Sequence, residues 1–177
     1  KVMDHAELAA RGEPGEREFL AQLYAEARGA YGFAYESYMM VRAYLEQRGI
    51  DLATAQRFGL GYAPDSWDAL ARALGKAQIP AELGERAGLL AERKSGGHYD
   101  RLRGRVTFPI QDVRGDVVAF GGRVLPNAAP KADGDEGPKY LNTPESPLFR
   151  KREAFYGLPE ALEAIRRSER AIIVEGY

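Results

Sequence analysis

The hydrophobic period of this chain changes in its middle, at the Ser-Gly-Gly of residues 95–97. Before this point, apolar residues recur at the spacing of about 3.6 residues that is typical of helices. After it, apolar and polar residues alternate in two runs, "YDRLRGRVTFPIQD" and "DVVAFGGRVL". The runs flank the short segment 113–116, so they predict a β-hairpin with a tight loop. The sequence therefore predicts an α+β or mixed α/β fold, with a helical N-terminal part followed by an antiparallel hairpin sheet.

The sequence of the N-terminal half predicts several helices with glycines between them. Gly29 and Gly32 divide the first helical stretch into two helices. Asp51 is placed to cap one later helix, and Asp65 or Ser66 is placed to cap the next. The predicted helices cover residues 16–47 in two parts, 52–58, 67–74 and 80–90.

The hairpin contains residues that interrupt a regular strand. Pro109 predicts an edge position or a bulge, because proline donates no hydrogen bond to a neighbouring strand. Gly121 and Gly122 predict a bulge or a close approach of another backbone segment. After the hairpin, the low-complexity segment 126–137 predicts a mobile loop.

Composition excludes several classes of site. The chain has no cysteine and two histidines, which excludes disulfides and cysteine-ligated zinc within it. No apolar run approaches the length of a membrane span, and no signal-like segment is found at the start. The net charge is −1, but acidic residues prevail before residue 93 and basic residues after it. This small excess does not by itself indicate a polyanion partner, so local placement has to decide.

Arginines alternate with other residues at the start of the hairpin. If a strand covers Arg101, Arg103 and Arg105, its alternation places all three guanidinium groups on one face. Arg123 on the next strand would extend this face. The positive charges are then balanced either by carboxylates of a solvated surface or by phosphate groups, which guanidinium binds with two parallel hydrogen bonds. Both interpretations remain open on the residues alone.

The segment "GPKYLNTPESPLFRKREAFYG", residues 137–157, combines prolines with basic residues. A solvated loop is the simplest interpretation for Arg150 and Arg152. Rigid proline turns could instead present Lys139 and Lys151 to a negatively charged ligand.

The chain closes with a predicted helix over 159–168 and the apolar run "AIIVEGY". Such a run is typical of a buried strand in a parallel α/β sheet. Glu175 then lies at the carboxyl end of the strand, where open α/β sheets carry metal ligands and general bases. One strand cannot form a sheet, so we expect the run to be the first strand of a truncated domain.

Four motifs of the chain carry a resemblance to a known family. They are "YLEQRGIDLATAQRFGLGYAPDSWDAL", "YDRLRGRVTFPIQDVRGDVVAFGGRVL", "PKYLNTPESPLFRKREAFYGL" and "AIIVEGY". In this order they resemble the catalytic core of bacterial replicative DNA primases of the DnaG type, over residues 40–177. The resemblance implies a primase N-terminal subdomain over 40–168 and the first strand of a Toprim subdomain over 169–177. Residues 1–39 form a poorly matched helical lead-in.

The resemblance also implies roles for individual residues. Basic and polar side chains of this subdomain would line a groove for the template, the initiating nucleotide and the growing primer. Lys139 and Lys151 would in addition act in catalysis with Glu175, which resembles the first Toprim acid and would bind Mg²⁺ or Mn²⁺. The residues that match the binding motifs are Arg48, Arg101, Arg103, Arg123, Lys139, Tyr140, Asn142 and Lys151.

By the same resemblance, the protein would read single-stranded DNA and join ribonucleoside triphosphates into short RNA primers during replication. Its partners would include the replicative helicase and the single-strand-binding protein, through the full-length protein, in the cytoplasm at the nucleoid and replisome. The family's zinc module would precede this core, and most of its metal-binding aspartates would follow Glu175. We therefore expect the chain to bind nucleic acid weakly and to synthesise nothing by itself.

Two other functions stay open. A different Toprim-associated enzyme, such as a phage primase–helicase or a nuclease, would share only "VEGY" with this chain. A non-catalytic module could bind single strands with arginines on the backbone and tyrosines stacked on bases. The longer motifs over 101–125 and 138–157 favour the primase.

Overall fold

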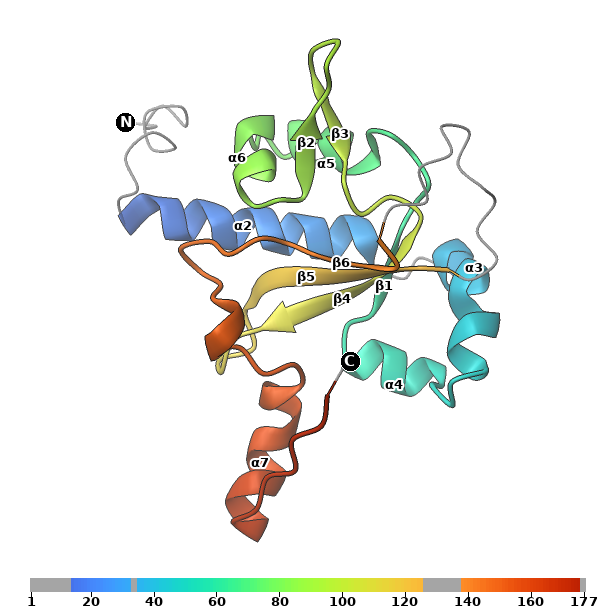
Figure 1. The fold of residues 1–177 in the computed structure, drawn as a ribbon, viewed down its shortest axis with the longest axis vertical. Coiled ribbons are helices and arrows are strands. Elements are labelled where there is room, and N and C mark those ends of the chain that lie inside the picture. Colours follow the sequence, from blue (N-terminus) through green and yellow to red (C-terminus); the bar gives the residue numbers. More distant parts are fainter. Residues whose placement is uncertain (1–13, 33–34, 126–137, 176–177) are drawn as a thin grey trace.

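The computed structural model describes residues 14–32, 35–125 and 138–175, and Figure 1 shows its ribbon. The predicted helices are confirmed, although the first ends at Tyr31 and passes through Gly29 without a break. The helices are α2 (Pro14–Tyr31), α3 (Tyr35–Glu46), α4 (Leu52–Arg57), α5 (Ala69–Lys76), α6 (Ala81–Arg86), α7 (Leu158–Ser168) and the 3₁₀-helix η1 (Lys151–Glu153).

The predicted hairpin forms the middle of an antiparallel sheet. Strand β4 (Arg105–Gln111) pairs with β5 (Val117–Val124), and a register shift lies between Ile110 and Gln111. Two short strands extend the pair on either side, in the order β1-β4-β5-β6. These are β1 (Gly61–Ala63) and β6 (Tyr140–Asn142), and a separate two-stranded sheet joins β2 (Leu90–Glu92) to β3 (His98–Asp100). The described residues thus combine helices with antiparallel sheet, as the sequence predicts.

Helix α2 covers one face of the four-stranded sheet. It lies between the sheet and the layer of α5 and α6 (Figure 1). Tyr24 and Tyr31 of α2 pack against Phe120 of β5, with ring centroids 6.2 Å and 5.6 Å apart. Leu23 is fully buried beside them. Each such apolar side chain contributes about 1.5–3 kcal/mol when it leaves water, which makes this face the main core.

Helices α3 and α4 cover part of the opposite face. Leu45 of α3 and Ala55 of α4 join a second buried cluster with Val106 and Phe108 of β4. Because successive strand residues alternate between faces, Arg123 of β5 points to this second face, whereas Gly122 points to the α2 face. At the other end of the second face, Phe149 packs with residues at the start of β5.

Both unusual positions of the hairpin have a structural reason. Strand β1 pairs only with residues 105–107 of β4, so Pro109 lies where β4 has lost its neighbour on that side. Its missing N–H therefore costs no ladder hydrogen bond. A Cβ atom on Gly122 would lie 2.9 Å from a methyl group of Leu102 and 3.1 Å from Cδ of Arg105. The crowding at this glycine thus comes from side chains and not from a backbone, and the pairing stays in register here, so no bulge forms.

The N-terminal cap of α5 differs from the sequence prediction. Asp68 occupies the cap position and its side chain makes no capping bond. The carboxylate of Asp100, at the end of β3, instead accepts hydrogen bonds from the backbone N–H groups of Leu70 and Ala71, at 2.6 Å and 3.1 Å. Neither Asp65 nor Ser66 caps the helix, because the fold delivers a carboxylate from a distant strand. The cap predicted for α4 is confirmed, since Asp51 accepts a bond from Thr54 N–H at 2.7 Å.

The closing run does not form a strand within the described residues. Residues 171–174 have no regular structure, and Ile172, Ile173 and Val174 are 92%, 74% and 76% exposed. A strand is held by hydrogen bonds to a neighbour, and no described strand pairs with this run. Helix α7 likewise buries none of its residues. The expectation that 169–177 is the first strand of a Toprim subdomain therefore stays a prediction.

Some predictions fall on residues outside the described part of the chain. These include the loop over 126–137 and the first 13 residues of the helical lead-in. Within the described ranges, no helix has both the length and the apolar character that crossing a membrane would require.

Candidate nucleic-acid interface

The three arginines predicted to share one strand face do not do so. Strand β4 begins only at Arg105, and residues 101–104 form turns that end at Gly104, whose φ is +68°. This left-handed conformation favours glycine. The turn sends Arg101 and Arg103 out of the sheet, so the alternation argument does not apply to them.

Arg101 and Arg103 contact the layer of α5, α6 and β2. Arg101 donates a hydrogen bond to the backbone oxygen of Gly88 at 3.2 Å. The guanidinium of Arg103 lies 3.6 Å from the ring centroid of Trp67 and pairs with Asp65 at 3.3 Å. The Arg103 side chain is 11% exposed. Both arginines are therefore held by specific contacts and are not freely solvated.

Arg105 is a buried guanidinium at the start of β4. It is 2% exposed, and it donates a hydrogen bond to the backbone oxygen of Lys139 at 3.4 Å. Its Nε atom has no partner among the described residues. Burial lowers the pKa of Arg105, and the positive charge of Arg103 lowers it further. The same Lys139 oxygen accepts a bond from Val124 N–H at 3.1 Å, so two contacts fix the backbone of Lys139 at the start of β6.

Arg48 and Arg123, far apart in the sequence, meet at one aromatic ring. The guanidinium carbon of Arg48 lies 4.9 Å from the ring centroid of Tyr44 on α3, and that of Arg123 lies 4.8 Å from it. Arg123 also lies 5.2 Å from the ring of Tyr140 and donates a hydrogen bond to its hydroxyl at 2.8 Å. We call these four residues, Arg48, Tyr44, Arg123 and Tyr140, the arginine–tyrosine cluster.

The arginine–tyrosine cluster carries two positive charges without a carboxylate. Among the described residues, neither Arg48 nor Arg123 forms an ion pair with an acid. Arg123 is 4% exposed, and its NH1 atom has no described partner. Burial raises the pKa of Tyr44, although Arg123 and Arg48 oppose the shift. The phenol therefore stays neutral at neutral pH and does not offset the two cations.

Strand β6 adds exposed polar groups to the same face. Tyr140 pairs directly with Arg123, and Asn142 pairs with Gly121, so both side chains point to the face of the arginine–tyrosine cluster. Tyr140 is 45% exposed, and Asn142 and Lys139 are exposed as well. The strand is fixed at its end by Thr143, whose hydroxyl accepts a bond from Phe120 N–H at 3.2 Å.

Lys151 and Glu175 lie apart from these residues. Lys151 is exposed in η1, and its backbone N–H donates to the carboxylate of Glu145 at 3.0 Å. Its neighbour Phe149 packs at the start of β5, roughly 15 Å along the strand from Arg123 at the usual rise per residue. Glu175 is exposed beyond α7. No group of three or more His, Cys, Asp or Glu side chains in the described ranges could hold a metal ion, so these residues alone do not fit one.

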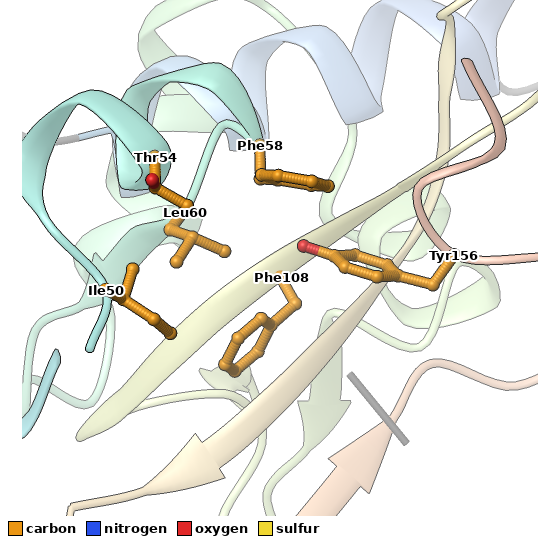
Figure 2. A pocket seen from close by; sticks show the side chains of 6 residues that line it. All are labelled: Ile50, Thr54, Phe58, Leu60, Phe108 and Tyr156. Atoms are coloured by element: carbon orange, nitrogen blue, oxygen red, sulfur yellow. The ribbon is translucent and has the colours of Figure 1, made fainter. Parts of the chain in front are cut away.

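A shallow apolar pocket lies on the same side of the sheet but has a different character. It has a volume of about 160 Å³ and no charged residue in its lining. Figure 2 shows the rings of Phe58, Phe108 and Tyr156 around it, and the rings of Phe58 and Tyr156 are stacked with centroids 6.1 Å apart. This pocket offers no positive charge to a phosphate, so the end of the sheet that carries Arg123 is the stronger candidate for a phosphate-binding site.

Sequence reasoning missed three residues of this region: Tyr44, Trp67 and Arg105 (as a buried anchor). Tyr44 and Arg48 are four residues apart, which places them on one side of a helix. That spacing was a usable signal. The meeting of Arg123 with Tyr44, and of Arg105 with Lys139, depends on tertiary contacts that no local pattern contains.

Comparison with known proteins shows to which family this chain belongs. Residues 33–162 match the model of the DNA primase catalytic core, N-terminal domain. The DNA primase of Halalkalibacterium halodurans is 46% identical over 137 residues, which cover 77% of this chain and 22% of that protein. The chain spans about a fifth of the length of the curated relatives it matches.

Solved structures agree with this match. The RNA polymerase domain of Mycobacterium tuberculosis primase DnaG superposes with a TM-score of 0.80 at 34% identity, covering 94% of this chain and 52% of that one. A DnaG primase catalytic domain bound to single-stranded DNA gives 0.72 at 37% identity, covering 86% and 47%. These matches do not favour the two alternative functions. The chain belongs to the DNA primase family, and its described fold is that of the N-terminal domain of the primase catalytic core.

Proposed function

We propose that this chain forms the part of a primase that binds the template and the nucleotides during synthesis of short RNA primers on single-stranded DNA. The observation that carries the proposal is the arginine–tyrosine cluster. It holds an exposed cation, Arg48, and a buried one, Arg123, with aromatic partners and no described acid. Arginine binds phosphate groups with two parallel hydrogen bonds. The similarity to a primase domain that was solved with single-stranded DNA supports this assignment.

The proposed roles follow the position of each side chain. Arg48, Arg123, Tyr140 and Asn142 would contact the nucleic acid on the second face of the sheet. Lys139 would bind phosphate groups of a nucleotide at the edge of this face, where Arg105 and Val124 fix its backbone. Arg101 and Arg103 would extend the positive surface toward Trp67.

Primer extension joins a 3′-hydroxyl to the α-phosphorus of a ribonucleoside triphosphate and releases pyrophosphate. Positive side chains assist this reaction by stabilising the charge that develops on the phosphate oxygens. Lys139 and Lys151 are our candidates for stabilising this charge. Glu175 is our candidate for one ligand of Mg²⁺ or Mn²⁺, but the described residues do not complete a metal site, and we derive no step from it. Contacts with a replicative helicase and a single-strand-binding protein would belong to the whole protein.

The test is the salt dependence of single-stranded DNA binding. We would measure the fluorescence anisotropy of a labelled oligonucleotide with the chain at increasing NaCl concentration. Because each phosphate contact on a single strand contributes about 0.7 to the log–log slope, Arg101→Ala with Arg103→Ala should flatten the slope by roughly 1.4. Arg114→Ala is the matched control, because Arg114 pairs with acids on a distant loop.

Two results would count against the proposal. If the chain does not bind the oligonucleotide at low salt, this domain has no template-binding role of its own. If it binds and the double variant has the slope of the unchanged chain, Arg101 and Arg103 make no phosphate contacts.

A further inference from the structure

Tyr44 matches no binding motif, yet its ring is the centre of the arginine–tyrosine cluster. Arg48 lies in the turn that directly follows α3, and its backbone N–H donates to the oxygen of Leu45 at 3.0 Å, which continues the helical path. Tyr44 and Arg48 therefore share one side of this turn. Arg123 reaches the same ring from β5, so Tyr44 joins a helix and a strand that carry one proposed phosphate ligand each.

Arg48 and Arg123 carry like charges, so an attractive contact is needed to keep the two guanidinium groups close together. Two guanidinium groups around one ring repel each other, and the described residues supply no carboxylate to either of them. The face of an aromatic ring attracts a cation, with the strongest effect where water is excluded. The ring of Tyr44, which is 9% exposed, offers this attraction to both arginines.

A ring contact and an ion pair use different parts of an arginine. A cation–π contact uses the planar face of the guanidinium, whereas phosphate oxygens accept hydrogen bonds from its N–H edge. Arg123 uses its Nε for Tyr140, and its NH1 is buried without a described partner. An ion pair with an acid would instead occupy this edge and cancel the charge.

We propose that Tyr44 is a positioning residue, which holds Arg48 and Arg123 at a fixed spacing for phosphate groups of a single-stranded nucleic acid. The inference rests on the proposed function, since it assumes that these arginines contact the strand. It adds a residue that acts through its ring, without touching the nucleic acid itself.

A purely structural role for Tyr44 makes a different prediction. Tyr44 belongs to the second buried cluster, so its truncation also loses packing. Tyr62 is a matched control because it lies in the same cluster, is 8% exposed, and has no guanidinium against its ring among the described contacts. Tyr44→Leu and Tyr62→Leu should therefore lose comparable thermal stability.

The experiment measures binding of a labelled single-stranded DNA oligonucleotide to the full 177-residue chain by fluorescence anisotropy across a NaCl series. The variants are Tyr44→Leu, Tyr44→Phe, Tyr62→Leu, and Arg48→Ala alone or combined with Tyr44→Leu. Circular dichroism melting shows which variants are folded at the assay temperature. If Tyr44→Leu is not folded there, Tyr44→Met is used in its place.

We expect Tyr44→Leu to weaken binding about fivefold to tenfold, as the loss of two ring contacts predicts. Its salt slope should fall by about 0.7 or more. Tyr44→Phe keeps the ring and should restore binding, and Tyr62→Leu should bind like the unchanged chain. Arg48→Ala should cost less in the Tyr44→Leu background than alone, because the two side chains act as one unit.

Two outcomes would overturn the inference. Equal binding by Tyr44→Leu and Tyr62→Leu, with Arg48→Ala fully additive, would make Tyr44 structural only and leave the proposed function intact. No binding by the unchanged chain would remove the proposed function and this inference together.

Discussion

Arg114 and Arg123 lie near the two ends of β5 and have opposite environments. Arg114, in the hairpin loop, is 74% exposed and lies 3.3 Å from the carboxylate of Asp112 and 3.6 Å from that of Asp116. Arg123 is 4% exposed and has two tyrosine rings in place of acids. Exposed ion pairs of this kind are worth little, and the two acids leave no net positive charge at Arg114 for an external anion. A buried arginine without an acid keeps its charge for an external anion. The type of partner therefore identifies the interface better than the number of arginines does.

The largest expected effect on primer synthesis concerns Lys139, which lies at the same end of β5 as Arg123. In a complete primase that contains this domain, Lys139→Ala should lower the rate of primer synthesis roughly 100-fold or more, as the loss of a charge-stabilising group does elsewhere. Gel analysis of labelled primers measures this rate. The melting temperature should change little, because the Lys139 side chain is exposed and Arg105 binds only its backbone oxygen. Arg114→Ala should retain full synthesis. A large loss of melting temperature would mean that Lys139 is structural.

A second prediction tests whether Arg123 is kept for folding or for binding. Replacing a buried charge by an apolar side chain of similar size is often neutral or stabilising. We expect Arg123→Met to leave the free energy of unfolding unchanged or to raise it by about 1 kcal/mol, while binding to single-stranded DNA falls. Arg114→Met should lower the free energy of unfolding by less than about 0.5 kcal/mol and bind single-stranded DNA normally. Urea denaturation measures the free energy of unfolding of both variants. A loss of more than about 2 kcal/mol in Arg123→Met, beyond a typical substitution, would show that the tyrosine contacts serve mainly the fold.

The smallest expected effect is on the stability of the fold. It concerns Asp112, beside Arg114 in the hairpin loop, and depends on pH. Burial alone would raise the pKa of Asp112, but hydrogen bonds from the backbone of Arg114 and Asp116 and from the Arg114 side chain outweigh it, and the pKa is lowered. The ionised carboxylate therefore stabilises the fold above the ordinary value of 3.8. This contribution disappears as the pH falls below 3.8 through the lowered pKa.

Asp112→Asn should accordingly destabilise the chain by about 0.5 kcal/mol at neutral pH. The difference from the unchanged chain should shrink on acidification, when both side chains are uncharged. Thermal unfolding between neutral and acid pH measures it. A difference that stays constant over this range would mean that the charge of Asp112 contributes nothing.

Local patterns predicted the elements that local interactions build. The alternation in residues 105–111 and 117–124 and the short loop between them specify the β4–β5 hairpin. Asp51 caps α4 from the adjacent position, so its role can be read from spacing. Asp100 could not be predicted as the cap of α5, because its approach depends on the second sheet and is separated from the helix by about 30 residues.

The residues of the candidate site likewise include some that sequence motifs predicted and others that depend on tertiary contacts. The motifs of the resemblance named Arg48, Arg123, Lys139, Tyr140 and Asn142, and the structure brings these residues to one end of the sheet. It does not bring Lys151 or Glu175 to them, and it removes Arg101 and Arg103 from β4. The error had a local cause, since alternation continues through 101–104 while Gly104 takes a left-handed turn. The ring that joins Arg48 to Arg123 could not be inferred from either segment alone.

Gly122 carries a consequence for how this domain tolerates mutation. The space that a Cβ atom would need is filled by Leu102 and by the stem of Arg105. Arg105 in turn holds the backbone oxygen of Lys139. A single added methyl group on β5 would therefore affect the candidate catalytic lysine, at the start of the neighbouring strand β6, through the side chain of Arg105 and without any change of charge. Gly122→Ala should behave as a defect in primer synthesis, although it lies on the opposite face of the sheet from the proposed nucleic-acid contacts.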